Sequence, residues 1–213
     1  PDLMLGTSAE IAHVGKLLGI PSAVVNEDDF DAVPLFSKWA YPFASHILAP
    51  DCCRVGKWSA KAIFYAGYHE LAYLHPRVFS PDRGRIAGLG NRDGRYFLLR
   101  FAKLTAHHDA GKKGIPPGIA MRIVEILEPH GSVWISAEGD LAPAFEKYRI
   151  PIKPSDMHHA LAFADLLIAD SQTMTAEAAV LGTPALRFND FVGKLGYLEE
   201  LENNYGLAFG IPT

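Results

Sequence analysis

The chain has 213 residues, of which 49% are hydrophobic and 21% are charged. These values are ordinary for a globular protein and exclude a disordered chain, and the length suffices for one large or two small domains. The formal net charge of −4 argues against a nucleic-acid-binding protein that relies on a broad basic surface.

The first part of the chain alternates predicted strands and helices. Short connections between such units predict a parallel sheet covered by helices. Residues 50–94 are rich in Gly, Pro, Arg and Tyr, which is typical of a connection or a binding loop. The expected elements before that loop are a strand over residues 2–6, a helix over 8–18, a strand over 22–26, a helix over 31–43 and a short strand over 45–49.

A second alternation begins at residue 96 and predicts six strands in a doubly wound sheet, where ligands bind at the carboxyl ends of the strands. The expected strands cover residues 96–101, 132–136, 150–152, 166–169, a segment ending at 188, and 207–209. The expected helices cover residues 117–127, 141–148, a segment after 155, a segment after 173, and 193–203.

The predicted fold class is therefore α/β, with two Rossmann-like, doubly wound parallel-sheet domains facing a cleft that suits a nucleotide and a second substrate. Residues 1–82 are expected to form the C-terminal part of an N-terminal domain plus a connector, and residues 83–213 a C-terminal domain. Because the chain starts at Pro1 in a predicted strand, we expect an internal fragment of a longer protein with its first domain truncated.

The two cysteines, Cys52 and Cys53, are adjacent. Adjacent cysteines rarely pair, and two cannot build a disulfide framework, so a reducing compartment fits best. No apolar run reaches the roughly 18 residues that span a bilayer, and no signal peptide is visible. We therefore expect a cytoplasmic protein without a transmembrane segment.

A polar turn from Asp170 to Thr173 separates a predicted strand from an Ala-rich helix that carries one acid, Glu177. The first amides of a helix lack internal acceptors and carry partial positive charge, so this turn is a candidate phosphate site. Glu177 lies about one helical turn further along, within reach of the group that is attached to the phosphate. The structural alternative is that Thr173 only caps the helix and Glu177 is a solvated side chain.

Residues 170–178 (Asp-Ser-Gln-Thr-Met-Thr-Ala-Glu-Ala), followed by Leu-Gly-Thr-Pro at 181–184, resemble the nucleotide-binding segment of the UDP-N-acetylglucosamine 2-epimerases, which have the GT-B fold. The closer resemblance is to a domain family of unknown function predicted to be GT-B glycosyltransferases. Its pattern is seen here as Gly-Tyr-His-Glu-Leu-Ala-Tyr-Leu at 67–74, as Arg100, and as Ala-His-His-Asp at 106–109.

The resemblance implies a nucleotide-sugar site in the second domain, with a diphosphate on the amides of residues 173–175 and the ribose hydroxyls on Glu177. Arg100 would neutralise the departing diphosphate, so that neither a metal nor a cofactor is needed. The expected nucleotide-sugar-binding residues are Ser171, Gln172, Thr173, Met174, Thr175, Glu177, Gly67, His69, Glu70 and Lys194. Alternatively, His69 and Glu70 contact the acceptor, or they only hold the segment that joins the two domains.

The catalytic candidates are Asp28, Glu27, Arg100 and His108. A carboxylate after a first-domain strand could activate an acceptor hydroxyl as a general base, and the resemblance favours Asp28; the alternative is a solvated acidic loop. His107 and His108 do not predict a metal site, because adjacent histidines diverge and no third ligand is spaced for it. His158 and His159 are expected at the start of the helix after residue 155. One of the two rings is expected to face the cleft near the base, and the other is expected only to pack against its neighbours.

The resulting functional hypothesis is a GT-B-type glycosyltransferase that uses a UDP-sugar in surface polysaccharide biosynthesis, with a sugar or lipid-linked acceptor. A homodimer is left open. The epimerase His-Arg-Arg-Glu-Asn segment is absent after Leu99, which favours glycosyl transfer over epimerisation. The alternatives are a sugar-nucleotide 2-epimerase and a non-catalytic nucleotide-sugar-binding module.

Overall fold

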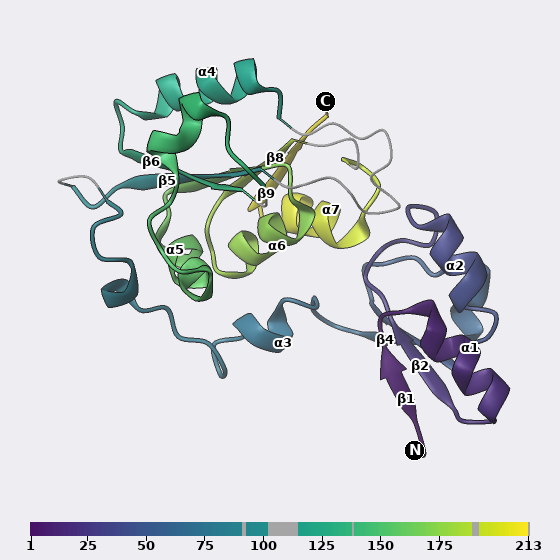
Figure 1. Cartoon of the computed structure of the whole chain (residues 1–213). Coiled ribbons are helices and arrows are strands. Elements are labelled where there is room, and N and C mark those ends of the chain that lie inside the picture. The colour runs from purple at the N-terminus through teal and green to yellow at the C-terminus, as the bar shows by residue number, and fades with distance from the viewer. Residues whose placement is uncertain (91–92, 102–114, 138, 189–191, 213) are drawn as a thin grey trace. The chain divides into compact units, whose positions relative to one another are not determined.

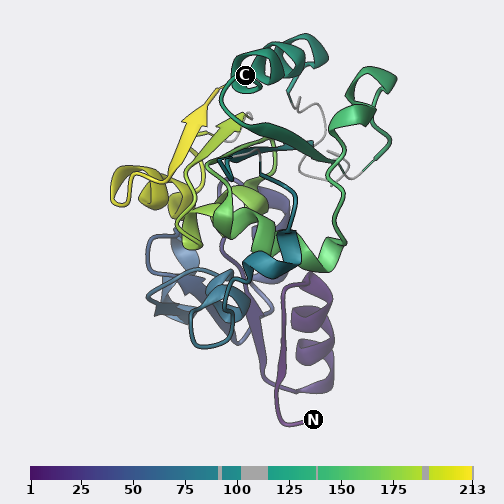
Figure 2. The same cartoon turned by 90° about the vertical axis from the view of Figure 1, so that its left-hand side faces the viewer.

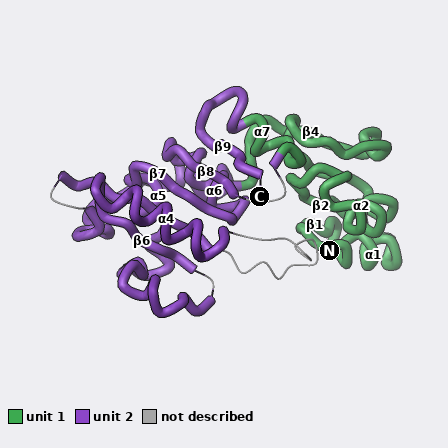
Figure 3. The backbone as a smooth tube through the Cα atoms, turned by 90° about the horizontal axis from the view of Figure 1, so that it is seen from above, with its two compact units in different colours: residues 1–69, 193–200 green, residues 70–192, 201–213 purple. Residues whose placement is uncertain are grey.

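The computed structural model describes residues 1–90, 93–101, 115–137, 139–188 and 192–212, and it divides into two compact α/β units (Figures 1 and 3). The first unit contains Pro1–His69 and Gly193–Glu200, and the second contains Glu70–Val192 and Leu201–Thr213. The division therefore falls before the expected boundary at residue 82. A short segment from late in the chain also belongs to the first unit, which the sequence did not predict.

The first unit is built on a sheet of four parallel strands in the order β1-β2-β3-β4. Its core lies between the sheet and the helices, with Val24 and Ile47 of the strands packed against Ala12 and Ala40 of α1 and α2. The elements are β1 (Met4–Gly6), α1 (Ala9–Leu18), β2 (Ser22–Val25), α2 (Pro34–Ala40), β3 (His46–Pro50), a 3₁₀ helix (Gly56–Lys61) and β4 (Ala62–Tyr65).

Local sequence explains where the two helices of this unit begin and end. Helix α1 follows Ser8, carries Glu10 in its first turn and ends at Gly19. Gly19 has φ 68°, a left-handed conformation that glycine adopts without strain at a helix C-terminus. Helix α2 begins at Pro34, because proline fits the first helical position, where no amide hydrogen bond is lost.

The second unit is built on five parallel strands in the order β6-β5-β7-β8-β9. The next two strands in the chain after β5, β6 and β7, lie on opposite sides of it, so the strand order reverses between β5 and β7. The elements are α3 (Leu71–Leu74), a 3₁₀ helix (Arg83–Ile86), β5 (Tyr96–Phe101), α4 (Pro117–Leu127), β6 (Ser132–Ala137), 3₁₀ helices (Pro143–Tyr148 and Pro154–Asp156), α5 (Met157–Phe163), β7 (Leu166–Ala169), α6 (Gln172–Val180), β8 (Ala185–Phe188) and β9 (Ala208–Ile211). Helix α7 (Gly196–Asn203) starts in the first unit and ends in the second.

Helices cover both faces of the second sheet, as Figures 1 and 2 show with α4 on one side and α5 and α6 on the other. Leu98 of β5 packs on the α5 and α6 side, whereas its neighbour Leu99 packs on the α4 side. This alternation follows from the two-residue period of a strand. The doubly wound parallel fold predicted from the sequence is confirmed.

The prediction was wrong about two strands. Residues 150–152 form no strand; the chain makes only an isolated bridge between Ile135 and Arg149, because Pro151 has no amide to donate to a sheet. Conversely, β4 lies within residues 50–94, where no element was expected. No helix in the described part of the chain is long and apolar enough to cross a membrane.

Candidate functional site

Helix α6 follows β7 directly, at the edge of the sheet where the carboxyl ends of the strands lie. Ser171 is its N-cap, and the Ser171 Oγ accepts a 3.3 Å hydrogen bond from the Met174 amide. The Ser171 carbonyl oxygen accepts from the amide of Thr175 at 3.3 Å and from its hydroxyl at 2.7 Å. Two of the three amides expected to hold a diphosphate are therefore already satisfied.

The amides of Gln172 and Thr173 differ from those of Met174 and Thr175, because no described residue accepts a hydrogen bond from them. Both side chains lie at least partly at the surface, whereas Met174 and Thr175 are buried. An anion at this helix end would thus meet the first two amides of α6, one position earlier than the sequence predicted, and the side chains of Met174 and Thr175 belong to the core.

The Glu177 carboxylate is held by two side chains from other elements. Its Oε1 accepts a 3.0 Å hydrogen bond from the Tyr73 hydroxyl of α3 and lies 3.0 Å from the His158 Nε2 of α5. The rings of Tyr73 and His158 pack at 5.5 Å. A carboxylate oxygen has room for about two donors, so Oε1 is occupied while Oε2 remains for a ligand. The side chain of Glu177 is 12% exposed.

Glu70 stands immediately before α3 and is 1% exposed. Its Oε2 is buried and has no hydrogen-bond partner among the described residues. Burial, and secondarily the negative charge of Glu177, raises the pKa of Glu70 to about 7. Its carboxyl therefore holds a proton up to near-neutral pH, which is unusual for a glutamate.

Arg100 is the penultimate residue of β5, next to the turn that starts α6. It pairs in register with Ala169 of β7 and with Ser136 of β6, and its Nη1 donates to the Ser136 Oγ at 2.8 Å. The strand order reverses between β5 and β7, and ligands of open α/β sheets bind at such a switch point. Arg100 and Ser171 thus flank the position that the topology favours. His108, the other catalytic candidate of this region, lies outside the described residues.

The two adjacent histidines of α5 have different roles. His158 faces Glu177, whereas His159 is buried and its Nδ1 accepts a 3.0 Å hydrogen bond from the Asp82 amide. The Phe79 ring packs against His159 at 4.9 Å. The segment that follows α3 is therefore fastened to α5, and this fixes Tyr73 over Glu177. Sequence reasoning missed Tyr73, because its contact with Glu177 joins residues that are 104 positions apart.

The remaining predicted residues belong to the first unit. Gly67, His69 and Lys194 lie there, and so do the acids that follow β2. Glu27 accepts a 3.1 Å hydrogen bond from the His69 amide. Asp28 is half-buried, and its carbonyl oxygen accepts from the Asn26 side chain at 2.7 Å.

Asp29, which the sequence did not single out, is fully buried. Its carboxylate accepts from the Arg54 amide at 2.7 Å and from the Gly196 amide. It therefore ties the segment around Gly196 to the rest of the first unit. A side chain at Gly196 would collide with the Cys52 carbonyl oxygen, so only glycine allows this close approach.

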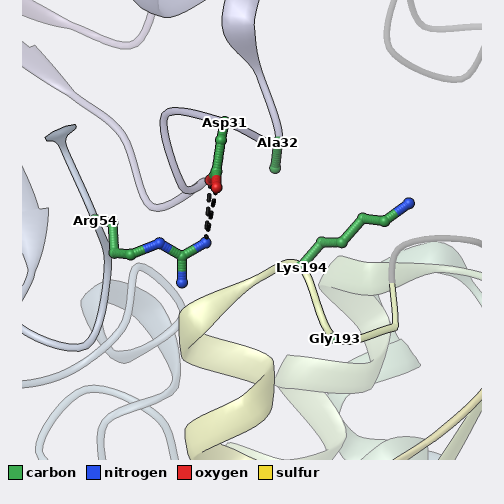
Figure 4. Close-up of a pocket in the computed structure, with 5 residues that line it drawn as sticks. All are labelled: Asp31, Ala32, Arg54, Gly193 and Lys194. Carbon is green, nitrogen blue, oxygen red and sulfur yellow. Dashed lines mark hydrogen bonds and ion pairs between the residues drawn. The ribbon is translucent and has the colours of Figure 1, made fainter.

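A pocket of about 270 Å³ lies in the first unit beside this segment (Figure 4). Arg54 Nη2 donates to both oxygens of Asp31 at 3.0 and 3.2 Å, and Figure 4 shows the Lys194 side chain directed away from that pair. Lys194 was expected to bind the nucleotide sugar, but it lines this pocket of the other unit. The lining residues are Asp31, Ala32, Arg54, Gly193 and Lys194.

Among the described residues, no three His, Cys, Asp or Glu side chains gather as a metal site requires. No family model matches the sequence, and no curated protein matches it. Similarity is found among solved structures.

The UDP-GlcNAc 2-epimerase from Methanocaldococcus jannaschii is similar to this chain with a TM-score of 0.65 at 18% identity, covering 100% of this chain and 66% of the epimerase. An Anabaena protein, HepE, in complex with UDP gives 0.57 at 14% identity, covering 99% of this chain and 65% of that protein. The calicheamicin glycosyltransferase CalG4 gives 0.54 at 12%, covering 100% and 61%.

The chain thus spans just under two thirds of the length of the epimerase and less of the glycosyltransferase. At these identities the likeness concerns the fold, and it agrees with the two parallel-sheet units and their strand orders. This chain therefore has the GT-B-like fold found in UDP-GlcNAc 2-epimerases and in glycosyltransferases.

Proposed function

We propose that this chain binds a UDP-sugar on its second unit and is part of a glycosyltransferase. The observation that carries the proposal is that α6 presents both Glu177 and its own first amides on one helix. The Oε1 of Glu177 is held by Tyr73 and His158, which directs Oε2 to a ligand, and the first two amides of the same helix are open to an anion. A nucleoside diphosphate has a partner for each of them: its ribose hydroxyls can donate to the carboxylate, and its phosphates can accept from the amides.

The proposed chemistry is transfer of the sugar to an acceptor hydroxyl. Arg100, beside the strand-order reversal, would offset the charge of the departing diphosphate. We further propose a sugar or lipid-linked acceptor in surface polysaccharide assembly, a reaction without a bound metal, and a cytoplasmic location. The free thiols of Cys52 and Cys53 support a reducing compartment.

Calorimetric titration of the chain with UDP, ADP and GDP tests the nucleotide site. We expect selective UDP binding, and we expect Glu177→Ala to weaken it about tenfold to a hundredfold, since hydrogen bonds to a charged group contribute about 1.5–3 kcal/mol. Glu125→Ala is the matched control, because Glu125 is exposed on α4, where it pairs with Arg122. Equal UDP affinity in the Glu177 and Glu125 variants would refute the site.

A 2-epimerase is the second candidate. The epimerase from Methanocaldococcus jannaschii has the higher TM-score, 0.65 against 0.54 for the glycosyltransferase CalG4. Glu70, whose pKa is raised to about 7, is also suited to proton transfer at neutral pH. Proton NMR of UDP-GlcNAc incubated with the chain distinguishes the two: appearance of the C2 epimer without an acceptor supports epimerisation, and release of UDP supports transfer.

A further inference from the structure

The two cysteines of the chain lie in the turn that follows β3, within the first unit. Cys52 is half-buried and Cys53 is buried, and their Sγ atoms are 4.0 Å apart. Backbone hydrogen bonds hold this turn: the Cys53 amide donates to the Pro50 carbonyl at 3.0 Å, and the Asp51 amide donates to the Tyr65 carbonyl at 3.0 Å. The first unit therefore presents two free thiols side by side at the carboxyl end of β3.

The two thiols differ in their surroundings. The Cys53 Sγ donates to the Glu27 carbonyl oxygen at 2.9 Å, and Cys53 is 5% exposed. Its hydrogen bond with Cys52, and secondarily burial, raise the pKa of the Cys53 thiol, so Cys53 keeps its proton at neutral pH. Cys52 is the more accessible of the two. An attack on a disulfide in solution therefore starts from Cys52.

A disulfide between these neighbours can form only as a strained ring. Adjacent Cα atoms are about 3.8 Å apart across a trans peptide, below the roughly 4.4–6.8 Å that an ordinary disulfide spans. The two Sγ atoms would also have to move from 4.0 Å to about 2.05 Å. Strain makes a disulfide easier to reduce. Such a bond suits a thiol pair that stays reduced in a reducing compartment and closes only when the thiol–disulfide balance becomes oxidising.

We propose that Cys52 and Cys53 form a reversible oxidation site for a low-molecular-weight disulfide such as oxidised glutathione. The Cys52 thiolate attacks this disulfide, its sulfur–sulfur bond breaks, and one glutathione leaves and takes up the proton lost by Cys52. The Cys53 sulfur then attacks the Cys52 Sγ of the mixed disulfide, and the second glutathione leaves with the proton from Cys53. The thiol pair thus loses two electrons, and oxidised glutathione gains them. This site is independent of the proposed UDP-sugar site.

The same turn holds the segment that joins the first unit from late in the chain. The Cys52 carbonyl oxygen lies so close to Gly196 that a side chain there would collide with it. The Arg54 amide, directly after Cys53, shares the Asp29 carboxylate with the Gly196 amide. Ring closure needs backbone movement between the two cysteines, and that peptide unit carries the Cys52 carbonyl. We therefore expect oxidation to loosen the contact between the turn and Gly196, where α7 begins.

Intact-mass analysis after incubation with oxidised glutathione tests the site in the parent chain, in Cys52→Ser and in Cys53→Ala. We expect the parent to lose two hydrogen atoms and to carry no glutathione. Cys53→Ala should keep one glutathione, because its ring cannot close. Cys52→Ser should react at least about tenfold more slowly than Cys53→Ala, since its remaining thiol is buried. Ser59→Ala, in the 3₁₀ helix after the turn, is the control and should close its ring like the parent.

Amide hydrogen exchange then tests the coupling to Gly196. In the oxidised parent the Gly196 amide should exchange about tenfold to a hundredfold faster than in the reduced chain, the range for a lost hydrogen bond to a charged group, and dithiothreitol should restore the slow rate. A parent that keeps both thiols, or that retains glutathione without closing the ring, overturns the oxidation site. Ring closure with unchanged exchange at Gly196 overturns the coupling alone.

Discussion

Replacing Glu70 with glutamine should change how the stability of the second unit depends on pH. Glu70 is 1% exposed, and its pKa is raised from 4.5 to about 7, chiefly by burial. Below pH 4.5 the carboxyl is protonated in both the folded and the unfolded chain. Between pH 4.5 and about 7 it ionises only in the unfolded chain, so the free energy of unfolding falls as the pH rises.

The size of this fall follows from the shift. Each pKa unit corresponds to about 1.4 kcal/mol, so a rise from 4.5 to about 7 corresponds to about 3 kcal/mol of stability, lost as the pH rises and constant above about pH 7. Glutamine has nearly the same shape and does not ionise. The stability of Glu70→Gln relative to the parent should therefore increase by about 3 kcal/mol between pH 4.5 and pH 8.5.

Urea denaturation followed by the fluorescence of Trp134 measures this difference, because Trp134 lies in the second unit and its Nε1 donates to the Leu89 carbonyl at 2.6 Å. Trp39 and Trp58, both in the first unit, are replaced by phenylalanine in every variant so that only one unit is observed. Glu125→Gln on the exposed face of α4 is the control and should show no such trend. A pH-independent difference between Glu70→Gln and the parent would refute the assignment of a buried, proton-carrying acid.

Three further predictions concern single residues of the two units. Tyr73→Phe should weaken UDP binding about fivefold in calorimetry, since Glu177 loses one of its two donors and a hydrogen bond contributes about 1 kcal/mol; unchanged affinity would show that Tyr73 does not position Glu177. Asp29→Ala should lower the free energy of unfolding of the first unit by about 3 kcal/mol in urea titrations, because it leaves the amides of Arg54 and Gly196 without their acceptor; a loss below about 1 kcal/mol would contradict that role. Gly67→Ala should cost about 1–3 kcal/mol of stability, because Gly67 has a φ of 127° that strains any other residue, and a neutral result would mean that the turn at Gly67 relaxes freely.

The strand, turn and helix from residue 166 to residue 180 could be predicted from the sequence, because local signals agree there. An apolar run gives β7, Ser171 supplies the cap, and an Ala-rich stretch continues the helix. Strand β4 had no comparable signal, because its four residues are largely exposed and adjoin a Gly- and Arg-rich stretch. Short strands at the edge of a sheet have weak patterns, since one side of the strand faces no partner.

The contacts that organise the candidate sites could not be predicted. Tyr73 and His158 reach Glu177 from segments that are distant in the sequence, and local pattern carries no information about such pairs. Among the consecutive acids after β2, the sequence cannot tell which is buried, and Asp29 rather than Asp28 is the one enclosed. The placement of Lys194 in the first unit likewise depends on where the chain crosses between units.

That crossing has a consequence for how the protein is made. Asp29 emerges from the ribosome early, but its partner Gly196 follows 167 residues later. At usual translation speeds the delay is roughly 10–30 s. During that interval the Asp29 carboxylate lacks the second of its two amide donors, which has not yet been synthesised. We therefore expect the final consolidation of the first unit to occur only after the segment around Gly196 has left the ribosome.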